Sequence, residues 1–413
     1  MKKRLVALDI IKGFSIIYIT FGHFGMWLGS EEWESLWRTI VLFMDWAAPS
    51  LFIVASAIGT MISIKKKQAS GKIEGIVKNA FIKFIFFFIV GEILNIVIEA
   101  YNPNKVGPWH LIYWNVITAI GMQQFVIHGL IKLRKSHLLL LLSTLIVIYP
   151  FLLNYCVNNM GYNISEEMFP ITYEDLKRFP VAVYFVVFQM AAMSPLISWV
   201  ILTIATILFF DEFTNYYVKS IKSRKDPERI RKYLGHLARK MIITGIFGIY
   251  FILLFGGLYL DRGLEVNRGT YIQWHNGDIY NWWPFEGHPL IWHRHTPHAL
   301  LYNLCMFAVL FGIIILTTEV KRKKVRFQKY LVPLGQLTFT LFLVTHILKL
   351  IPYRWNFPIV MLITIPSLII MAYLAYIWVE KARMIGSIEW LYVIYSGIIN
   401  GIINKKKREK KHI

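Results

Sequence analysis

The stretch that decides the fold is Ala7–Gly29, which reads ALDIIKGFSIIYITFGHFGMWLG. Its length and apolar character predict a membrane-spanning helix, because about 20 apolar residues cross the hydrocarbon core of a bilayer. It nevertheless contains three ionisable residues, Asp9, Lys12 and His23. Ionisable side chains are costly inside a membrane, so their presence there indicates a functional site.

Lys12 and His23 fall on one face of this predicted helix. Their separation in sequence places them within about 20° of each other and about 16 Å apart along the axis. Asp9 lies one turn before Lys12, so the helix would present charged groups at one end and an imidazole at the other. This arrangement suits a protein that takes a charged ligand from one side and does proton chemistry towards the other. The alternative is that Lys12 extends to the interface and His23 makes a structural bond to a neighbouring helix.

The composition of the whole chain agrees with a membrane protein. Of its 413 residues, 56% are hydrophobic and only 17% are charged, against about 25% in soluble domains. The mean hydropathy is +0.50. We therefore predict an all-α fold, a polytopic bundle of about ten transmembrane helices followed by a C-terminal interfacial helix.

The predicted spans end where basic clusters or Pro/Gly-rich loops begin. They are Ala7–Gly29, Thr39–Ile64, Asn79–Ala100, Leu111–Ile131, Leu138–Val157, Val183–Phe210, Met241–Leu260, His298–Thr317, Leu331–Ile351 and Pro358–Val379. The last apolar stretch, Ile385–Ile403, has basic residues on both sides, so we expect it to lie on the membrane. This divides the chain into a transmembrane domain, 1–384, and an interfacial helix with a basic tail, 385–413.

The net charge of +21 follows the predicted topology. With both termini in the cytoplasm, 35 of the 45 Lys and Arg residues fall on cytoplasmic segments, nine fall outside, and the remaining one is Lys12. This is the positive-inside pattern of a multi-pass protein of the cytoplasmic membrane, whose first partner is the lipid bilayer. No aromatic-basic motif for nucleic acid accompanies it. The oligomeric state is left open, a homodimer included.

Four polar residues from distant parts of the sequence share the outer third of the predicted bundle: His23, Asp45, His298 and His346. A carboxylate beside an imidazole fixes its tautomer and raises its basicity, as a general base requires. Charged groups in membranes face the bundle interior, so His23 is expected to contact Asp45 or His346. Equal depth does not fix the rotation of a helix, and the alternative is that these groups never meet.

The longest outer loop, Asp261–Pro297, is rich in aromatic and histidine residues. Trp274, Trp283, His293 and His295 are candidates for the binding of a sugar or a lipid headgroup. An interfacial aromatic belt would have the same composition. We expect no metal, because no cysteine or carboxylate completes a zinc-ligand spacing around these histidines.

Four motifs resemble a superfamily of membrane acyltransferases. Leu8–His23 is similar to its first helix, which typically reads Leu-Asp-x-x-Arg-Gly, with ten residues between that arginine and a following histidine. Here Lys12 stands where that arginine is usual, and lysine lacks the two-pronged guanidinium. Asp45-x-x-x-Pro49, Gly335–His346 and Gly386–Trp390 resemble later elements of the same proteins. The superfamily includes the acyltransferase-3 proteins and the heparan-α-glucosaminide N-acetyltransferase family.

The resemblance implies transfer of an acyl group, with acetyl favoured, from cytoplasmic acetyl-CoA to a hydroxyl or amine of a glycan or lipid-linked acceptor outside. His23 would act as base or nucleophile and Asp45 would orient it, with His346 and His298 as secondary catalytic candidates. Lys12, beside Asp9, would bind the phosphates of acyl-CoA. The main alternative is a transporter or flippase with a proton relay, and a third is a membrane scaffold without activity.

Overall fold

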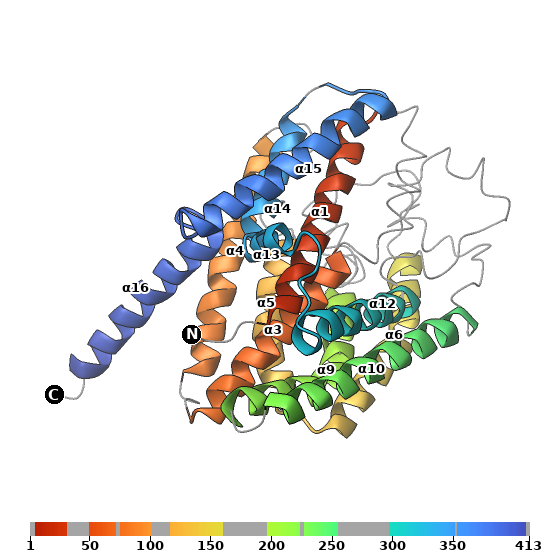
Figure 1. The fold of residues 1–413 in the computed structure, drawn as a ribbon, viewed down its shortest axis with the longest axis vertical. Helices are drawn as coiled ribbons and strands as arrows, with labels where there is room; N and C mark the ends of the chain where they lie inside the picture. The colour runs from red at the N-terminus through yellow and green to blue at the C-terminus, as the bar shows by residue number, and fades with distance from the viewer. Residues whose placement is uncertain are drawn as a thin grey trace.

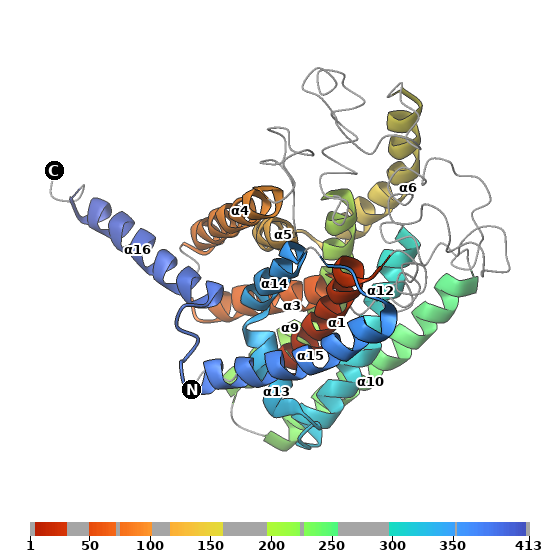
Figure 2. The same ribbon diagram turned by 90° about the horizontal axis from the view of Figure 1, so that it is seen from above.

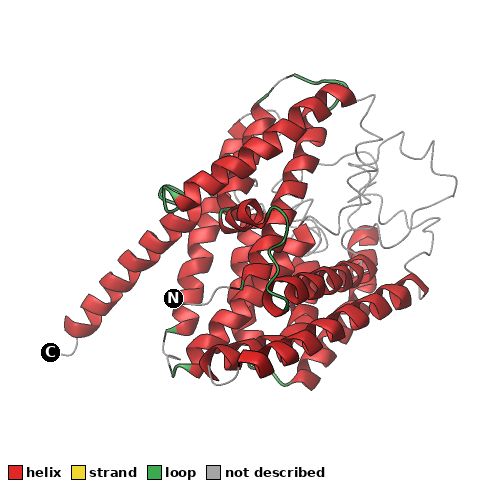
Figure 3. Cartoon of the chain, viewed as in Figure 1, coloured by secondary structure: helices red, strands yellow, loops and turns green. Residues whose placement is uncertain are grey.

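The computed structural model describes residues 5–30, 49–71, 75–100, 116–159, 196–223, 227–254, 297–351 and 353–409. These residues form helices and connecting turns, and no strand occurs among them (Figure 3). The twelve α-helices of these ranges are α1 (Val6–Leu28), α3 (Pro49–Ala69), α4 (Ile76–Ala100), α5 (Val116–Leu130), α6 (Lys135–Asn159), α9 (Leu196–Ser223), α10 (Pro227–Ile252), α12 (Pro297–Ile315), α13 (Gln328–Gln336), α14 (Thr338–His346), α15 (Phe357–Glu380) and α16 (Ile388–Glu409). The prediction of an all-α fold is confirmed.

Three of these helices are long and apolar enough to cross a membrane. They cover Val6–Gly25, Ala299–Val320 and Phe357–Glu380, and they match the first, eighth and tenth predicted spans. Among the described residues the count is therefore three candidate spans, against the ten predicted. Part of the difference arises because four predicted spans, Thr39–Ile64, Leu111–Ile131, Val183–Phe210 and Met241–Leu260, extend beyond the described ranges.

The predicted ninth helix, Leu331–Ile351, is not continuous. The structure divides it into α13, α14 and a 3-10 turn, Ile347–Leu350. Pro333, which has no backbone N–H to donate, lies inside α13, and Leu337 leaves helical geometry at φ −102° and ψ 24°. The expectation of one straight helix was wrong because apolar periodicity does not register this break.

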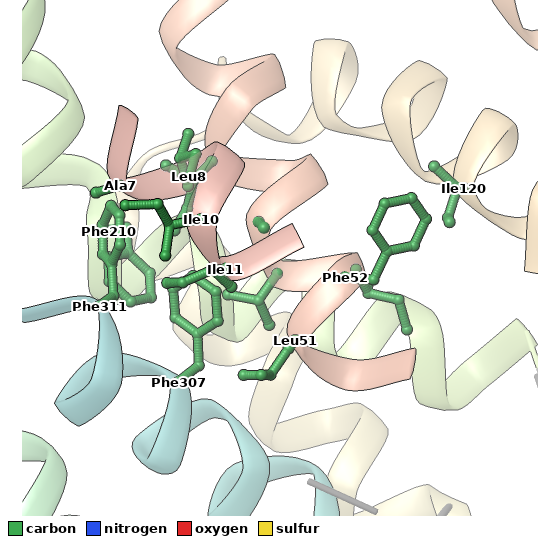
Figure 4. Close-up of a cluster of buried hydrophobic side chains, with 14 of the residues drawn as sticks. Ala7, Leu8, Ile10, Ile11, Leu51, Phe52, Ile120, Phe210, Phe307 and Phe311 are labelled. Atoms are coloured by element: carbon green, nitrogen blue, oxygen red, sulfur yellow. The ribbon is translucent and has the colours of Figure 1, made fainter. Parts of the chain in front are cut away.

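Helix α1 lies at the centre of the bundle. It contacts α3, α12, α13, α14 and α15, and both views place it among them (Figures 1 and 2). Its first turns sit on a cluster of aromatic rings from two other helices. Phe210 of α9 lies against Phe307 and Phe311 of α12, at centroid distances of 5.5 and 5.9 Å, beside Ile10 and Ile11 (Figure 4). This core fixes the position of the helix that carries Lys12 and His23.

Two glycines allow α13 to touch the backbone of α1. A Cβ added at Gly335 would lie 1.9 Å from the carbonyl oxygen of Asp9, and one added at Gly13 would lie 2.1 Å from that of Leu331. No real Cβ is tolerated at such distances, and backbone atoms cannot rotate away as a side chain can. Both residues must be glycine for the two helices to cross this closely.

We expect Gly335→Ala to destabilise the protein substantially. Overpacking costs typically about 1–3 kcal/mol, and a clash with backbone falls at the upper end of that range. The matched control is Gly59→Ala in α3, where a Cβ would meet nothing within 4 Å. There, alanine should raise helix stability by up to about 1 kcal/mol. Thermal unfolding of the purified proteins in detergent measures both, and equal melting temperatures for G335A and wild type would contradict the close crossing.

Candidate functional site

The C-terminal half of α1 places His23 against α14. His23 is buried, and its Nδ1 lies 3.1 Å from Oγ1 of Thr345, a residue 322 positions away in the chain. The Thr345 hydroxyl donates its single proton to the carbonyl oxygen of Phe342, at 2.8 Å. When that proton goes to Phe342, Nδ1 of His23 carries the proton of the His23–Thr345 bond, since a hydroxyl has only one hydrogen. In this tautomer Nε2 is the acceptor nitrogen of His23, whereas in the other tautomer the Thr345 hydroxyl donates to Nδ1.

His346, the last residue of α14, has Nε2 as its acceptor nitrogen. Its Nδ1 lies 2.8 Å from the carbonyl oxygen of Phe342, which can only accept, so Nδ1 donates and Nε2 is the basic nitrogen. The carbonyl of Phe342 therefore organises both Thr345 and His346. The ring centroids of His23 and His346 are 5.0 Å apart, with the rings at 75°.

Aromatic side chains enclose the two imidazoles. Trp27, one turn after His23, stacks on it at a centroid distance of 4.0 Å and lies 5.1 Å from His346. Phe342 lies 6.0 Å from His23 and 4.5 Å from His346. We call His23, Trp27, Phe342, Thr345 and His346 the outer histidine cluster. The sequence analysis named its two histidines but not the other three residues, although each lies within one turn of a named histidine.

The segment before α15 closes the end of α1 next to this cluster. The backbone N–H of Trp355 donates to the carbonyl of Leu28 at 2.7 Å, and that of Ser30 donates to the carbonyl of Trp355 at 2.8 Å. The Arg354 guanidinium donates to the carbonyl of Trp27. These bonds hold the turn of α1 that carries Trp27, and with it the stacking on His23.

The N-terminal half of α1 carries Lys12, whose charge acts on Lys83 of α4. Its Nζ lies 6.0 Å from the ring centroid of Phe52 in α3. Lys83 of α4 lies over two rings, 5.7 Å from the centroid of Phe87 and 5.4 Å from that of Tyr392. The charges of both Lys12 and Lys67 act on the Lys83 ammonium. We call Lys12, Lys67 and Lys83 the inner lysine cluster, and the sequence analysis had identified only Lys12.

Lys65, two residues before Lys67, is paired with a carboxylate. It is buried, and its Nζ donates to Oδ1 of Asp211 at 2.5 Å and to Oγ1 of Thr214 at 2.7 Å. Burial lowers the pKa of Lys65, and the hydrogen bond and charge of Asp211 oppose that shift. Among the described residues no ion pair of Lys67 or Lys83 with a carboxylate is present. Lys65 is therefore a structural cation, held by Asp211 and Thr214.

The remaining predicted site residues are not placed by the structure. Asp45, Trp274, Trp283, His293 and His295 lie outside the described residues. His298 is the second residue of α12, and its side chain is likewise outside the description. Asp9 is buried in α1. Within the described ranges, no three His, Cys, Asp or Glu side chains gather as metal ligands would.

No family model matches this chain, and no curated protein matches it significantly. The two clusters that α1 joins and the motifs of the sequence are therefore the observations that bear on its function.

Proposed function

We propose that this chain is an integral-membrane acyltransferase. It would transfer an acyl group, acetyl in the favoured case, from cytoplasmic acyl-CoA to a hydroxyl or amine of a glycan or lipid-linked acceptor outside. One observation supports this most: a single buried helix, α1, carries a cation of the inner lysine cluster and, about 16 Å further along, a buried imidazole whose Nδ1 is bonded to Thr345. Charge for a phosphate-bearing donor and a base for the transfer thus lie on one rigid element.

The chemistry assigned to His23 uses the tautomer in which Nε2 is the acceptor nitrogen. Nε2 takes the proton of the acceptor as the acceptor oxygen or nitrogen attacks the thioester carbon. The carbon–sulfur bond breaks, and the proton passes to the departing CoA sulfur. In the variant route Nε2 itself attacks the thioester carbon, and the carbon–sulfur bond breaks as CoA leaves as the thiolate. The acceptor then attacks the acyl carbon, the bond to Nε2 breaks, and the acceptor's proton passes to the CoA sulfur. Thr345 holds Nδ1–H in either route, and His346 presents a second Nε2 beside it.

The other predicted residues take supporting roles in this proposal. Asp45 would orient an imidazole, and His298 would act near the outer face. Trp274, Trp283, His293 and His295 would bind the acceptor. Lys12 would bind the donor phosphates together with Lys67 and Lys83, and Asp9 would tune the charge of Lys12.

The proposed architecture is ten spans with both termini in the cytoplasm and α16 on the membrane surface. Helix α10 supports membrane embedding beyond the three candidate spans. Its residues Ile243, Phe247 and Tyr250, together with Leu254 just after its end, recur at helical spacing, and each is at least 60% exposed. A continuous exposed apolar face of this kind fits contact with lipid tails.

Reporter fusions test this architecture. A reporter at Lys411 should score as cytoplasmic and one at Asn276 as external, because the basic residues concentrate on the cytoplasmic side. The two fusions control for each other, because the same protein should give a cytoplasmic signal at one position and an external signal at the other. A tag at Lys411 that is accessible from outside intact cells would refute the ten-span topology.

A membrane transporter or flippase is the second candidate. The break between α13 and α14 favours it, because discontinuous helices form the binding sites of many transporters. Acyl-CoA hydrolysis by the purified protein that depends on His23 would support the enzyme. Movement of substrate into liposomes in the absence of CoA would support the transporter. If the protein shows neither activity, a scaffold role is what remains.

A further inference from the structure

The start of α14 lacks a cap of its own. Helix α14 is nine residues long, and its N-cap residue, Leu337, is apolar and makes no side-chain cap bond. The first N–H groups of a helix have no partner within it, and the positive end of the helix dipole lies there. A short helix at a break in the chain therefore needs an acceptor from elsewhere.

Glu389 of α16 supplies that acceptor. Its Oε1 accepts from the backbone N–H of Phe339 at 2.9 Å, and its Oε2 accepts from the Thr340 hydroxyl at 2.6 Å. Burial raises the pKa of Glu389, and its hydrogen bonds with Thr340 and Phe339 oppose that shift. Such a placement of a carboxylate is costly unless its hydrogen bonds are satisfied.

The two helix starts hold each other. The Thr340 hydroxyl that donates to Glu389 accepts in turn from the backbone N–H of Ile388, at 2.9 Å. The α16 end is fixed as well, because Oγ of Ser387 accepts from the N–H of Trp390 at 3.1 Å. The carboxylate is therefore part of a reciprocal junction and has little freedom to move.

The turn before Glu389 has a strained backbone, and a side-chain hydrogen bond holds it in place. Arg383, Met384 and Gly386 have positive φ values of 49°, 64° and 82°. Left-handed backbone is unfavourable for residues other than glycine and persists where the surroundings enforce it. Here Nε1 of Trp378 donates to the carbonyl of Ile385 at 2.8 Å and locks the turn.

We propose that Glu389 is a positioning residue for the outer histidine cluster. It fixes the first turn of α14, and the last turn of the same helix carries Thr345 and His346. A nine-residue helix is about 14 Å long and moves as a rigid rod, so a shift at its start displaces its end. The Thr345 contact that holds the tautomer of His23 then depends on a carboxylate that touches neither histidine.

The test compares Glu389→Gln and Glu389→Asp with Glu380→Gln, an exposed glutamate at the end of α15. Side-chain ¹⁵N spectra of the full-length protein report the histidine tautomers, with the His23 and His346 signals assigned by loss in H23N and H346N. In wild type and E380Q both rings should show an acceptor Nε2. In E389Q, and more mildly in E389D, the His23 signal should shift towards a mixture of tautomers, while the protein stays monodisperse.

Kinetics give the second readout, which rests on the proposed acyltransferase function. E389Q should lower kcat about tenfold and leave KM for acetyl-CoA within about twofold, because the substitution replaces no lysine of the inner lysine cluster. If the spectra of E389Q are altered but the wild-type protein shows no transferase activity, the positioning role is supported and the proposed function is rejected. Wild-type spectra and kcat in folded E389Q would overturn the positioning role and leave the function intact.

Discussion

Replacement of His23 by alanine is expected to abolish acyl transfer while the protein still folds. With the Thr345 hydroxyl donating to Phe342, Nε2 of His23 is the acceptor nitrogen of a buried ring held by Thr345, as a general base requires. Loss of such a base typically lowers a rate by about 10²–10⁴-fold. The measurement is the release of CoA thiol from acetyl-CoA by the purified variant, together with its thermal unfolding.

Two further variants distinguish loss of the His23 base from loss of the residue that holds it. Thr345→Val keeps the His23 imidazole but removes the acceptor of its Nδ1 proton, so it should retain part of the activity. His236→Ala removes an exposed histidine of α10 and should behave as wild type. Transfer at the wild-type rate in folded H23A would remove His23 from the mechanism, whatever the other variants do.

Replacement of Lys12 by alanine is expected to weaken donor use more than acceptor use. Lys12 belongs to the inner lysine cluster, about 16 Å from His23 along α1. A lysine–phosphate contact is a charge-assisted hydrogen bond of roughly 1.5–3 kcal/mol, so its loss costs about ten- to a hundredfold in binding. Lys12→Arg should retain activity. Acetyl-CoA affinity, measured by calorimetry on the purified variants, distinguishes these outcomes.

The competing role of Lys12 is an ion-pair partner for Asp9. In that case the alanine variant loses stability, and removal of both charges in the D9A/K12A double variant restores it. Lys240→Ala is the matched control, because Lys240 pairs with Glu212 at the protein surface and lies in neither cluster. Unchanged acetyl-CoA affinity in K12A, with stability recovered in the double variant, would make Lys12 a structural residue.

The parts of the site that the sequence predicted are those that depend on spacing along one helix. Lys12 and His23 share a face of α1 because helical geometry requires it. The meeting of His23 with His346 was one of several arrangements, since the depth of a residue does not determine the rotation of its helix. The structure settles that rotation through tertiary contacts, such as those of Gly335 with Asp9 and of Trp355 with Leu28.

The parts that were missed depend on contacts between distant segments. The break at Leu337 leaves the apolar pattern of Leu331–Ile351 unchanged, so periodicity could not reveal it. Glu389 had been noted only as part of a motif, because its bonds to Phe339 and Thr340 cross between two helices. Lys83 falls within the predicted span Asn79–Ala100 and was not singled out, because only the fold brings it under the charges of Lys12 and Lys67.

The most direct measurement uses sealed, right-side-out membrane vesicles loaded with labelled acetyl-CoA. The vesicles carry wild-type protein, H23A or no protein, and a glycan and lipid extract is supplied outside. Label should appear on an external acceptor with the wild-type protein and remain absent in the other two. External acceptors that stay unlabelled with folded wild-type protein, while solutes cross the same vesicles without CoA, would contradict acyl transfer and favour a transporter.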